Sequence, residues 1–233
     1  MQANLFSGPT GDLKALQDRL QAMGGRIRDA RRLDPVSQFV RSFIASRTHD
    51  RDSWEAFWRL TRRFETWDAL ADAPVAEIEA LLVGVTHPEK KAPELKEALR
   101  TIRARAGELN LNFLEGLSVQ HALRWLETLH GVGRKIAAAT LNFSTLRKPA
   151  FVVETHILRV LERFGFVRMG ATTEQAYDAV MAAAEGFDAD DFYELHWHLK
   201  RLGQRVCTQP HADCRRCVLS GLCLQRVEAA RAA

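Results

Sequence analysis

Several features that define common protein classes are missing from this sequence. No apolar run approaches the roughly 20 residues that a membrane-spanning helix needs, so the chain is not expected to enter a bilayer. The opening residues, MQANLFSGPTGDLKAL, lack the basic and then apolar pattern of a secretory signal peptide. We therefore expect a cytoplasmic protein of the bacterial type, without a membrane partner.

Strand signals are also scarce. β-Branched residues rarely alternate with polar ones, and no Asn-Gly or Asp-Gly dipeptide marks a tight hairpin. Helical periodicity dominates, so the sequence predicts an all-α fold. Helices are expected after Asp34-Pro35, over 52–65, from Pro74 to Leu82, up to residue 105, on both sides of 130–133, and over 155–164, 173–184 and 190–202.

Two local features refine this expectation. Pro88 and Pro93 are expected to bracket a charged loop before the helix that ends near residue 105, because proline interrupts helices. The aromatic stripe at Trp54, Phe57 and Trp58 is expected to belong to the core rather than to a cofactor site.

The composition is that of a globular protein. Hydrophobic residues make up 46% and charged residues 27% of the chain, which excludes a disordered protein. At 233 residues the chain is long enough for two modest domains or one large one. The formal charge of +4 is compatible with an anionic partner but does not demonstrate one.

Cysteine is absent from the first 206 residues and then occurs four times, as Cys207, Cys214, Cys217 and Cys223. A disulfide framework would distribute such residues around a small secreted fold, and this chain is neither small nor secreted in character. Four thiolates so close in sequence suit one tetrahedral metal ion or one metal cluster. The spacing alone leaves structural zinc open as an alternative.

The stretch LHGVGRKIA places Gly131 and Gly133 between two helical segments, with Arg134 and Lys135 directly after them. Glycines at this spacing allow a tight turn with accessible backbone N–H groups. N–H groups that converge at a helix start can bind an anion such as a nucleic-acid phosphate. An ordinary turn between two helices, with a glycine cap, is the alternative.

This hairpin, the segment VVETHILRVLERFG and the spacing C-x6-C-x2-C-x5-C follow one another in that order. Together they resemble the endonuclease III family of DNA glycosylases, within the helix-hairpin-helix superfamily, from about Asp34 to Cys223. The resemblance implies a six-helix barrel domain over 34–148 and an iron–sulfur cluster domain formed by 1–33 with 149–233. It also implies that the four cysteines bind a 4Fe–4S cluster rather than zinc.

The resemblance implies roles for individual residues. Lys135 matches the lysine that bifunctional members use as a nucleophile at C1′ of an extruded nucleotide, forming a Schiff base; a phosphate contact is the alternative role. Glu154 matches the family's catalytic carboxylate. DNA contacts are expected from two segments, and the residues concerned are Leu129, Gly131, Val132, Gly133 and Arg134 in the hairpin, and Ser46, Arg47 and His49 further upstream.

Two positions depart from the family pattern. Glu154 stands where relatives have Asp, and a shift of about 1 Å in a catalytic group can cost on the order of 100-fold in rate. Ser46 stands where relatives have the Gln that fills the gap left by the extruded base, and Ser is too short for that task. We therefore expect Arg47, His49 or a residue of the loop from Val85 to His87 to fill the gap.

The resemblance thus implies a monomeric repair enzyme at the bacterial nucleoid. It implies duplex DNA with damaged or abasic nucleotides as the partner, and an activity that combines excision of damaged bases, oxidised pyrimidines being expected, with cleavage at abasic sites. A glycosylase without lyase activity or with altered specificity, or a non-cutting binder of distorted DNA, is the alternative.

Overall fold

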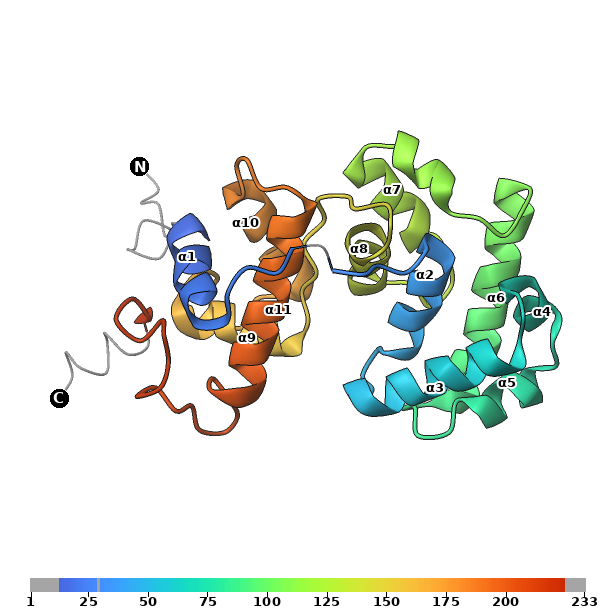
Figure 1. Ribbon diagram of the computed structural model, residues 1–233, viewed down its shortest axis with the longest axis horizontal. Helices are drawn as coiled ribbons and strands as arrows, with labels where there is room; N and C mark the ends of the chain where they lie inside the picture. Colours follow the sequence, from blue (N-terminus) through green and yellow to red (C-terminus); the bar gives the residue numbers. More distant parts are fainter. Residues whose placement is uncertain (1–12, 29, 225–233) are drawn as a thin grey trace. The chain divides into compact units, whose positions relative to one another are not determined.

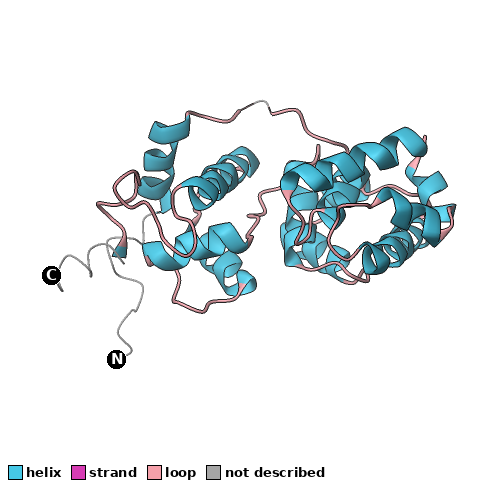
Figure 2. Cartoon of the chain, turned by 90° about the horizontal axis from the view of Figure 1, so that it is seen from below, coloured by secondary structure: helices cyan, strands magenta, loops and turns pink. Residues whose placement is uncertain are grey.

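The computed structural model describes residues 13–28 and 30–224. Every regular element in these ranges is a helix, which confirms the predicted all-α class (Figure 2). The helices in Figure 1 are α1 (Leu13–Gly24), α2 (Pro35–Ile44), α3 (Asp50–Arg63), α4 (Trp67–Asp72), α5 (Val75–Leu81), α6 (Pro88–Ala106), α7 (Val119–Glu127), α8 (Arg134–Phe143), α9 (Thr155–Phe164), α10 (Thr173–Ala183) and α11 (Ala189–Arg205), with a 3₁₀ turn η1 (Asn112–Gly116) before α7. Over the described ranges, no helix is both long and apolar enough to cross a membrane.

The chain forms two compact units, one of residues 31–148 and one that combines residues up to 30 with residues from 149 onward. The expected division between domains lay after residue 33, three residues later. Contacts of this short segment explain the difference: the Arg32 guanidinium donates to the Asn142 carbonyl, and Leu33 forms an isolated β-bridge with Ser144. Both contacts attach the segment to the unit of residues 31–148.

Helix α2 is the central element of the unit of residues 31–148. Its start is fixed by the Asp34 side chain, which accepts a hydrogen bond of 2.9 Å from the Ser37 N–H, and by Pro35 in the first turn. All residues of α2 are buried, because α3, α6 and α8 pack around it (Figure 1). Helices α4 and α5 pack on α6, and α7 packs on α8.

The predicted loop between Pro88 and Pro93 is wrong, because α6 runs through both prolines. Pro88 occupies the first helical position, where a missing N–H costs nothing. Pro93 lies in the second turn and removes a single backbone bond, to the carbonyl of the exposed Glu89. The helix continues because Ala92, Leu95 and Leu99 bury its apolar side.

The prediction for the aromatic stripe on α3 is only partly right. Phe57 is buried with 2% of its surface exposed, but Trp54 and Trp58 retain 39% and 48% exposure. The two tryptophans lie one turn apart on the outer side of α3, where their rings stack with centroids 5.8 Å apart. The Phe57 ring contacts both tryptophan rings edge-on, with centroids 5.7 Å from Trp54 and 5.4 Å from Trp58, so Phe57 forms the buried end of one aromatic cluster.

The other unit is built on α11, which packs against both α9 and α1, while α10 packs on α9 (Figure 1). A close approach of α11 to α9 occurs at Gly203, where an added Cβ would lie 2.9 Å from the His156 carbonyl oxygen. The Glu194 carboxylate on α11 also accepts a hydrogen bond of 2.6 Å from the Ile27 N–H. Residues 206–223 follow α11 as turns, and they carry the cysteines.

Candidate functional site

The two hairpin glycines have different roles. Gly131 has φ of +75°, and an added Cβ would lie 2.9 Å from Cζ of Phe43 on α2, so only glycine fits without displacement. Gly133 has φ of −99° and ψ of 178°, an extended backbone that any residue adopts. The expectation that both glycines are needed for their backbone is therefore correct only for Gly131. No atom lies within 4 Å of a Cβ placed on Gly133, so this position presents an open surface at the start of α8.

Three neighbours expected to contact DNA have structural contacts within the hairpin. Leu129 and Val132 are 2% and 6% exposed, and the Val132 N–H donates to the Leu129 carbonyl at 3.1 Å. The Arg134 guanidinium pairs with the Glu127 carboxylate and so ties α8 to the end of α7. These contacts fix the shape of the turn that exposes the backbone around Gly133.

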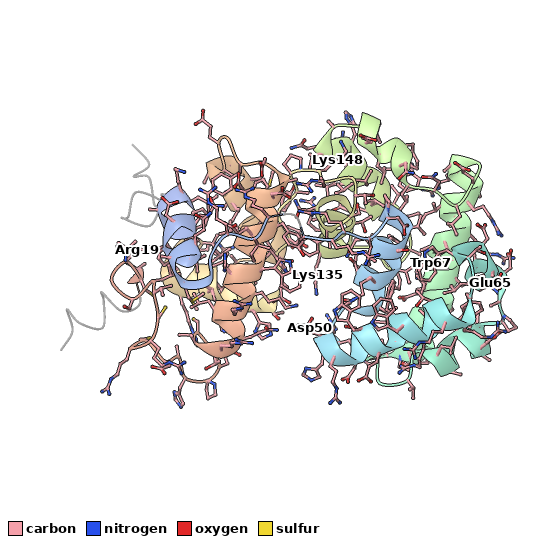
Figure 3. All side chains as sticks on the ribbon, in the orientation of Figure 1. Arg19, Asp50, Glu65, Trp67, Lys135 and Lys148 are labelled. Atoms are coloured by element: carbon pink, nitrogen blue, oxygen red, sulfur yellow. The ribbon has the colours of Figure 1, made fainter. Side chains whose placement is uncertain are left out.

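Lys135 is the second residue of α8, as predicted, and is half-buried (Figure 3). The N-terminal end of a helix carries partial positive charge, so Lys135 lies at a positively polarised position. A second ammonium group, that of Lys91 on α6, interacts electrostatically with Lys135.

Lys91 is a residue that the sequence reasoning missed. Its side chain is buried, with 8% exposure, and this burial lowers the pKa of Lys91 to about 8. The positive charges of Lys135 and Arg47 lower this pKa further, whereas Glu94 opposes the shift. The signal was a lysine four residues before Leu95, hence on the apolar side of α6, but it is visible only if residues 88–93 are helical.

The segment expected to enter the DNA joins α2 to α3. Arg47 and His49 are exposed, Ser46 is half-buried, and Arg47 has φ of 54°, a left-handed conformation that is uncommon outside glycine. In the other candidate loop, Val85 is buried with 5% exposure, so its side chain is not available to fill a gap in DNA. His87 in that loop is exposed and also left-handed, with φ of 55°.

A second buried cation lies next to this segment. The guanidinium carbon of Arg41 on α2 lies 4.2 Å from the centre of the Trp54 ring, and the residue is 8% exposed. Burial lowers the pKa of Arg41 to about 10, although Asp50 at the start of α3 opposes the shift. No sequence pattern pointed to Arg41, because it shares a polar stripe with Ser37, Gln38 and Ser42 that resembles an ordinary solvated face, although here the whole helix is buried.

Glu154 lies at the N-cap position of α9, in the unit that does not contain Lys135. Its side chain does not cap the helix, and its Oε1 atom is buried without a hydrogen-bond partner in the described part of the chain. The preceding residues are anchored by a 2.8 Å hydrogen bond between the Val152 carbonyl and Nδ1 of His196 on α11. A buried carboxylate oxygen without a partner is uncommon in proteins, and this distinguishes Glu154 from the other helix N-cap residues that the structure describes.

The four cysteines line one cavity of about 340 Å³ together with Arg163 and the turns after α11. None of them forms a disulfide, and all four are half-buried. Burial raises the pKa of the Cys217 thiol, and the other three cysteines raise it further. Across residues 13–28 and 30–224, no three His, Cys, Asp or Glu side chains come close enough together to hold a single metal ion.

Two arginines of α9 hold the segment that carries the first cysteine. Arg159 donates to the Cys207 carbonyl at 2.9 Å and to the Gly203 carbonyl at 2.7 Å. Arg163 donates to the Thr208 carbonyl at 2.7 Å and to Sγ of Cys207 at 3.6 Å. The helix that begins at Glu154 thus supports one wall of the cysteine-lined cavity.

Comparison with known proteins gives a family match over much of the chain. The family described as "HhH-GPD superfamily base excision DNA repair protein" matches residues 40–185. A putative DNA glycosylase of Arabidopsis thaliana is 32% identical over 139 residues, which cover 59% of this chain and 47% of that protein. The chain therefore aligns with about half of this relative.

Endonuclease III of Thermotoga maritima is 26% identical over 196 residues, covering 84% of this chain and 85% of that protein. Among solved structures, a non-covalent complex of endonuclease III with DNA superposes with a TM-score of 0.79 at 18% identity, over 95% of this chain and 98% of that one. A thermostable thymine-DNA glycosylase superposes with a TM-score of 0.72 at 18% identity, over 92% and 96% of the two chains. These likenesses extend to the fold of nearly the whole chain.

Proposed function

The chain belongs to the HhH-GPD superfamily of base excision DNA repair proteins, and on that premise we propose that it excises damaged bases from duplex DNA and cleaves the resulting abasic site. The observation that carries the lyase part is the placement of Lys135. Its amine lies at the start of α8, two residues after the open surface at Gly133, and beside the buried ammonium group of Lys91.

The proposed reaction begins when the backbone around Gly133 binds a phosphate and the damaged nucleotide leaves the base stack. The neutral amine of Lys135 attacks C1′, and the base departs with the electron pair of the glycosidic bond and takes up a proton. Opening of the sugar ring then gives a protonated imine, which acidifies the C2′ proton. Loss of that proton forms the C2′–C3′ double bond as the C3′–O bond breaks and the 3′ phosphate departs with its electron pair. The carboxylate of Glu154 supports the positive charge that develops at the sugar.

The four cysteines are proposed to hold a 4Fe–4S cluster. Four thiols around one cavity match the donor set of such a cluster, in which each cysteine binds its own iron. A single zinc ion would require the thiols to converge on one point, and the described residues contain no such convergence. When bound, the cluster would act as a structural brace for the turns after α11.

The proposed partner is duplex DNA with damaged or abasic nucleotides, bound by a monomer at the bacterial nucleoid, and the proposed bases are oxidised pyrimidines. A glycosylase without lyase activity, or a non-cutting binder of distorted DNA, is the second candidate. It is favoured by Glu154 and Ser46, which replace the side chains that the endonuclease III pattern places at these positions.

Borohydride trapping on an abasic duplex tests the lyase proposal, because only a Schiff base is reduced to a covalent adduct. We expect a wild-type adduct, none with Lys135→Ala, and an unchanged adduct with Lys90→Ala, which alters an exposed lysine of the same unit. Release of free base without any adduct would identify a glycosylase that lacks lyase activity. If a panel of lesions gave neither adduct nor free base, the result would support a non-cutting binder of distorted DNA.

The role of Glu154 is tested by measuring the rate of base excision in Glu154 variants. We expect Glu154→Gln to lower single-turnover excision by about 100-fold or more, because it removes the charge that stabilises the transition state. DNA affinity should be unchanged or higher, since a negative charge leaves a surface that binds phosphate. Equal rates for the Glu, Gln and Asp forms would show that residue 154 takes no part in the chemistry.

A further inference from the structure

The buried ammonium group of Lys91 connects α6 to the end of α2. Its Nζ atom donates to the Ile44 carbonyl at 3.1 Å, to the Ser46 carbonyl, and to Oγ1 of Thr48 at 3.1 Å. An ammonium group has three N–H donors, and here each donor has an oxygen partner. Two of these oxygens belong to residues 45–49, the segment between α2 and α3.

A second loop is attached to the same group. Oγ1 of Thr48 accepts from the Thr86 N–H at 3.1 Å, and the Thr86 hydroxyl donates to the Arg47 carbonyl at 2.8 Å. Thr48 also donates to the Ser46 carbonyl at 3.2 Å. Residues 45–49 and 84–87, which we call the paired loops, are therefore joined by side-chain bonds around Lys91.

The paired loops hold unusual backbone conformations. Arg47 and His87 both have positive φ, at 54° and 55°, although neither is glycine. Such conformations are strained and persist only where surrounding contacts impose them. For Arg47 these contacts are explicit, because the Ser46 carbonyl before it bonds to Lys91 and its own carbonyl bonds to Thr86. The backbone of Arg47 is therefore held in place by hydrogen bonds, while its side chain is exposed.

We propose that Lys91 is the positioning residue for nucleotide extrusion: it fixes the paired loops so that Arg47 enters the gap left by the extruded nucleotide. This inference rests on the proposed function. It also removes the difficulty created by Ser46, whose short side chain cannot reach into the stack. In this arrangement the Ser46 carbonyl accepts the hydrogen bond that anchors the loop to Lys91, and Arg47 contributes the side chain that occupies the gap.

The test measures insertion alone, without chemistry. The duplex carries a tetrahydrofuran abasic analogue, which cannot form a Schiff base, opposite 2-aminopurine, whose fluorescence changes when a side chain enters the stack. Failure of the proposed excision chemistry therefore leaves this measurement intact. The variants are Lys91→Met, Arg47→Ala and the double variant, and the control is Lys96→Met, which removes another α6 lysine whose Nζ bonds to the Ala73 carbonyl at 2.6 Å.

Since displacement of a functional group by about 1 Å costs on the order of 100-fold, we expect Lys91→Met to slow insertion by about 30-fold or more. Affinity for the duplex should change less than about threefold, because phosphate contacts dominate affinity. In the Arg47→Ala background the same Lys91 substitution should have less than about a threefold effect, because no side chain remains to be positioned. Lys96→Met should leave insertion unchanged.

An equal loss in both Arg47 backgrounds would overturn the proposal, because it would indicate general destabilisation. No loss with Lys91→Met would overturn it as well. If Lys91→Met does not fold, Thr86→Val provides the second variant, since it removes the bond to the Arg47 carbonyl from a half-buried position. Slower insertion with Thr86→Val, absent in the Arg47→Ala background, would support the proposal, and an unchanged rate would overturn it.

Discussion

The unit of residues 31–148 closes on itself through helix packing, whereas the unit of α1 and α9–α11 surrounds a cavity that thiols line. In the first unit, α2 is buried on every side, and polar groups such as Lys91 are satisfied by carbonyls of the same unit. In the second, Arg159 and Arg163 donate to carbonyls of the turns after α11 that line the cavity. We therefore expect a bound group to affect the stability of the second unit and not that of the first.

The largest expected effect follows from a cysteine substitution, which should destabilise one unit and leave the other unchanged. Cys217→Ser should abolish the broad absorbance near about 400 nm that an iron–sulfur cluster gives, and should remove most hydrogen-exchange protection from α9–α11. Protection in α2, α6 and α8 should stay within a factor of about 3, because these helices belong to the other unit.

The control for this change is Arg216→Ser, which alters the neighbouring residue, whose side chain is 77% exposed. It should retain both the absorbance and the protection. Equal loss of protection in the two units of Cys217→Ser would show that they fold as one, and stoichiometric zinc in colourless wild-type protein would disprove the cluster.

A smaller effect sharpens the comparison within the first unit. Gly131→Ala should lower the free energy of unfolding by about 2 kcal/mol or more, because a left-handed backbone and a contact with Phe43 both oppose a Cβ. Gly133→Ala should change stability by less than about 1 kcal/mol, because its backbone is extended and its surroundings are open, so that only the preference of an N-cap for Gly over Ala remains. Urea unfolding of the two variants measures the difference.

The same two variants should reverse their order in DNA binding. A methyl group on Gly133 would occupy the surface at which a phosphate approaches, so Gly133→Ala should weaken binding to every duplex alike, by about tenfold or roughly 1.4 kcal/mol. A change of lesion preference with unchanged affinity would contradict the assignment of the hairpin to phosphate binding.

An effect of similar size concerns pH and Lys91. Its pKa is about 8 in the folded protein, chiefly because of burial, against 10.5 ordinarily. Between these values the unfolded chain binds more protons than the folded one, so the free energy of unfolding should rise with pH, by at most about 1.4 kcal/mol per unit. Lys91→Met should lack this rise. Urea unfolding at pH 7.5, 8.5 and 9.5 measures the difference, and parallel curves would show that the pKa of Lys91 is not lowered.

Much of the fold was accessible from the sequence because local signals agree with tertiary structure. The Asp34-Pro35 start of α2 and the positions of α7, α8 and α9 follow from caps and apolar periodicity. The extension of α6 through Pro93 did not follow, because burial of Leu95 and its neighbours outweighs the local preference of proline. Tertiary packing decided that element.

The candidate site divides in the same way. Lys135 and the cysteines were predicted as site residues because their motifs are patterns of spacing along the chain. Lys91 and Arg41 were missed because their burial depends on which helix faces pack inside, and no linear motif reports that. The difference between Gly131 and Gly133 became visible only from their backbone angles, because the sequence alone does not distinguish one glycine from another.

The unit that holds the cysteines is assembled from two separated parts of the chain, with the other unit inserted between them. During synthesis, α1 leaves the ribosome long before α11, the helix against which it packs. At about 5–20 residues per second, the separation from Gly24 to Ala189 corresponds to roughly 10 to 30 seconds. For that time the apolar side chains of Leu13, Leu16 and Leu20 lack their native partner, while residues 31–148 can already fold. The nascent chain therefore presents an apolar helix that chaperones can bind until the last part of the unit arrives.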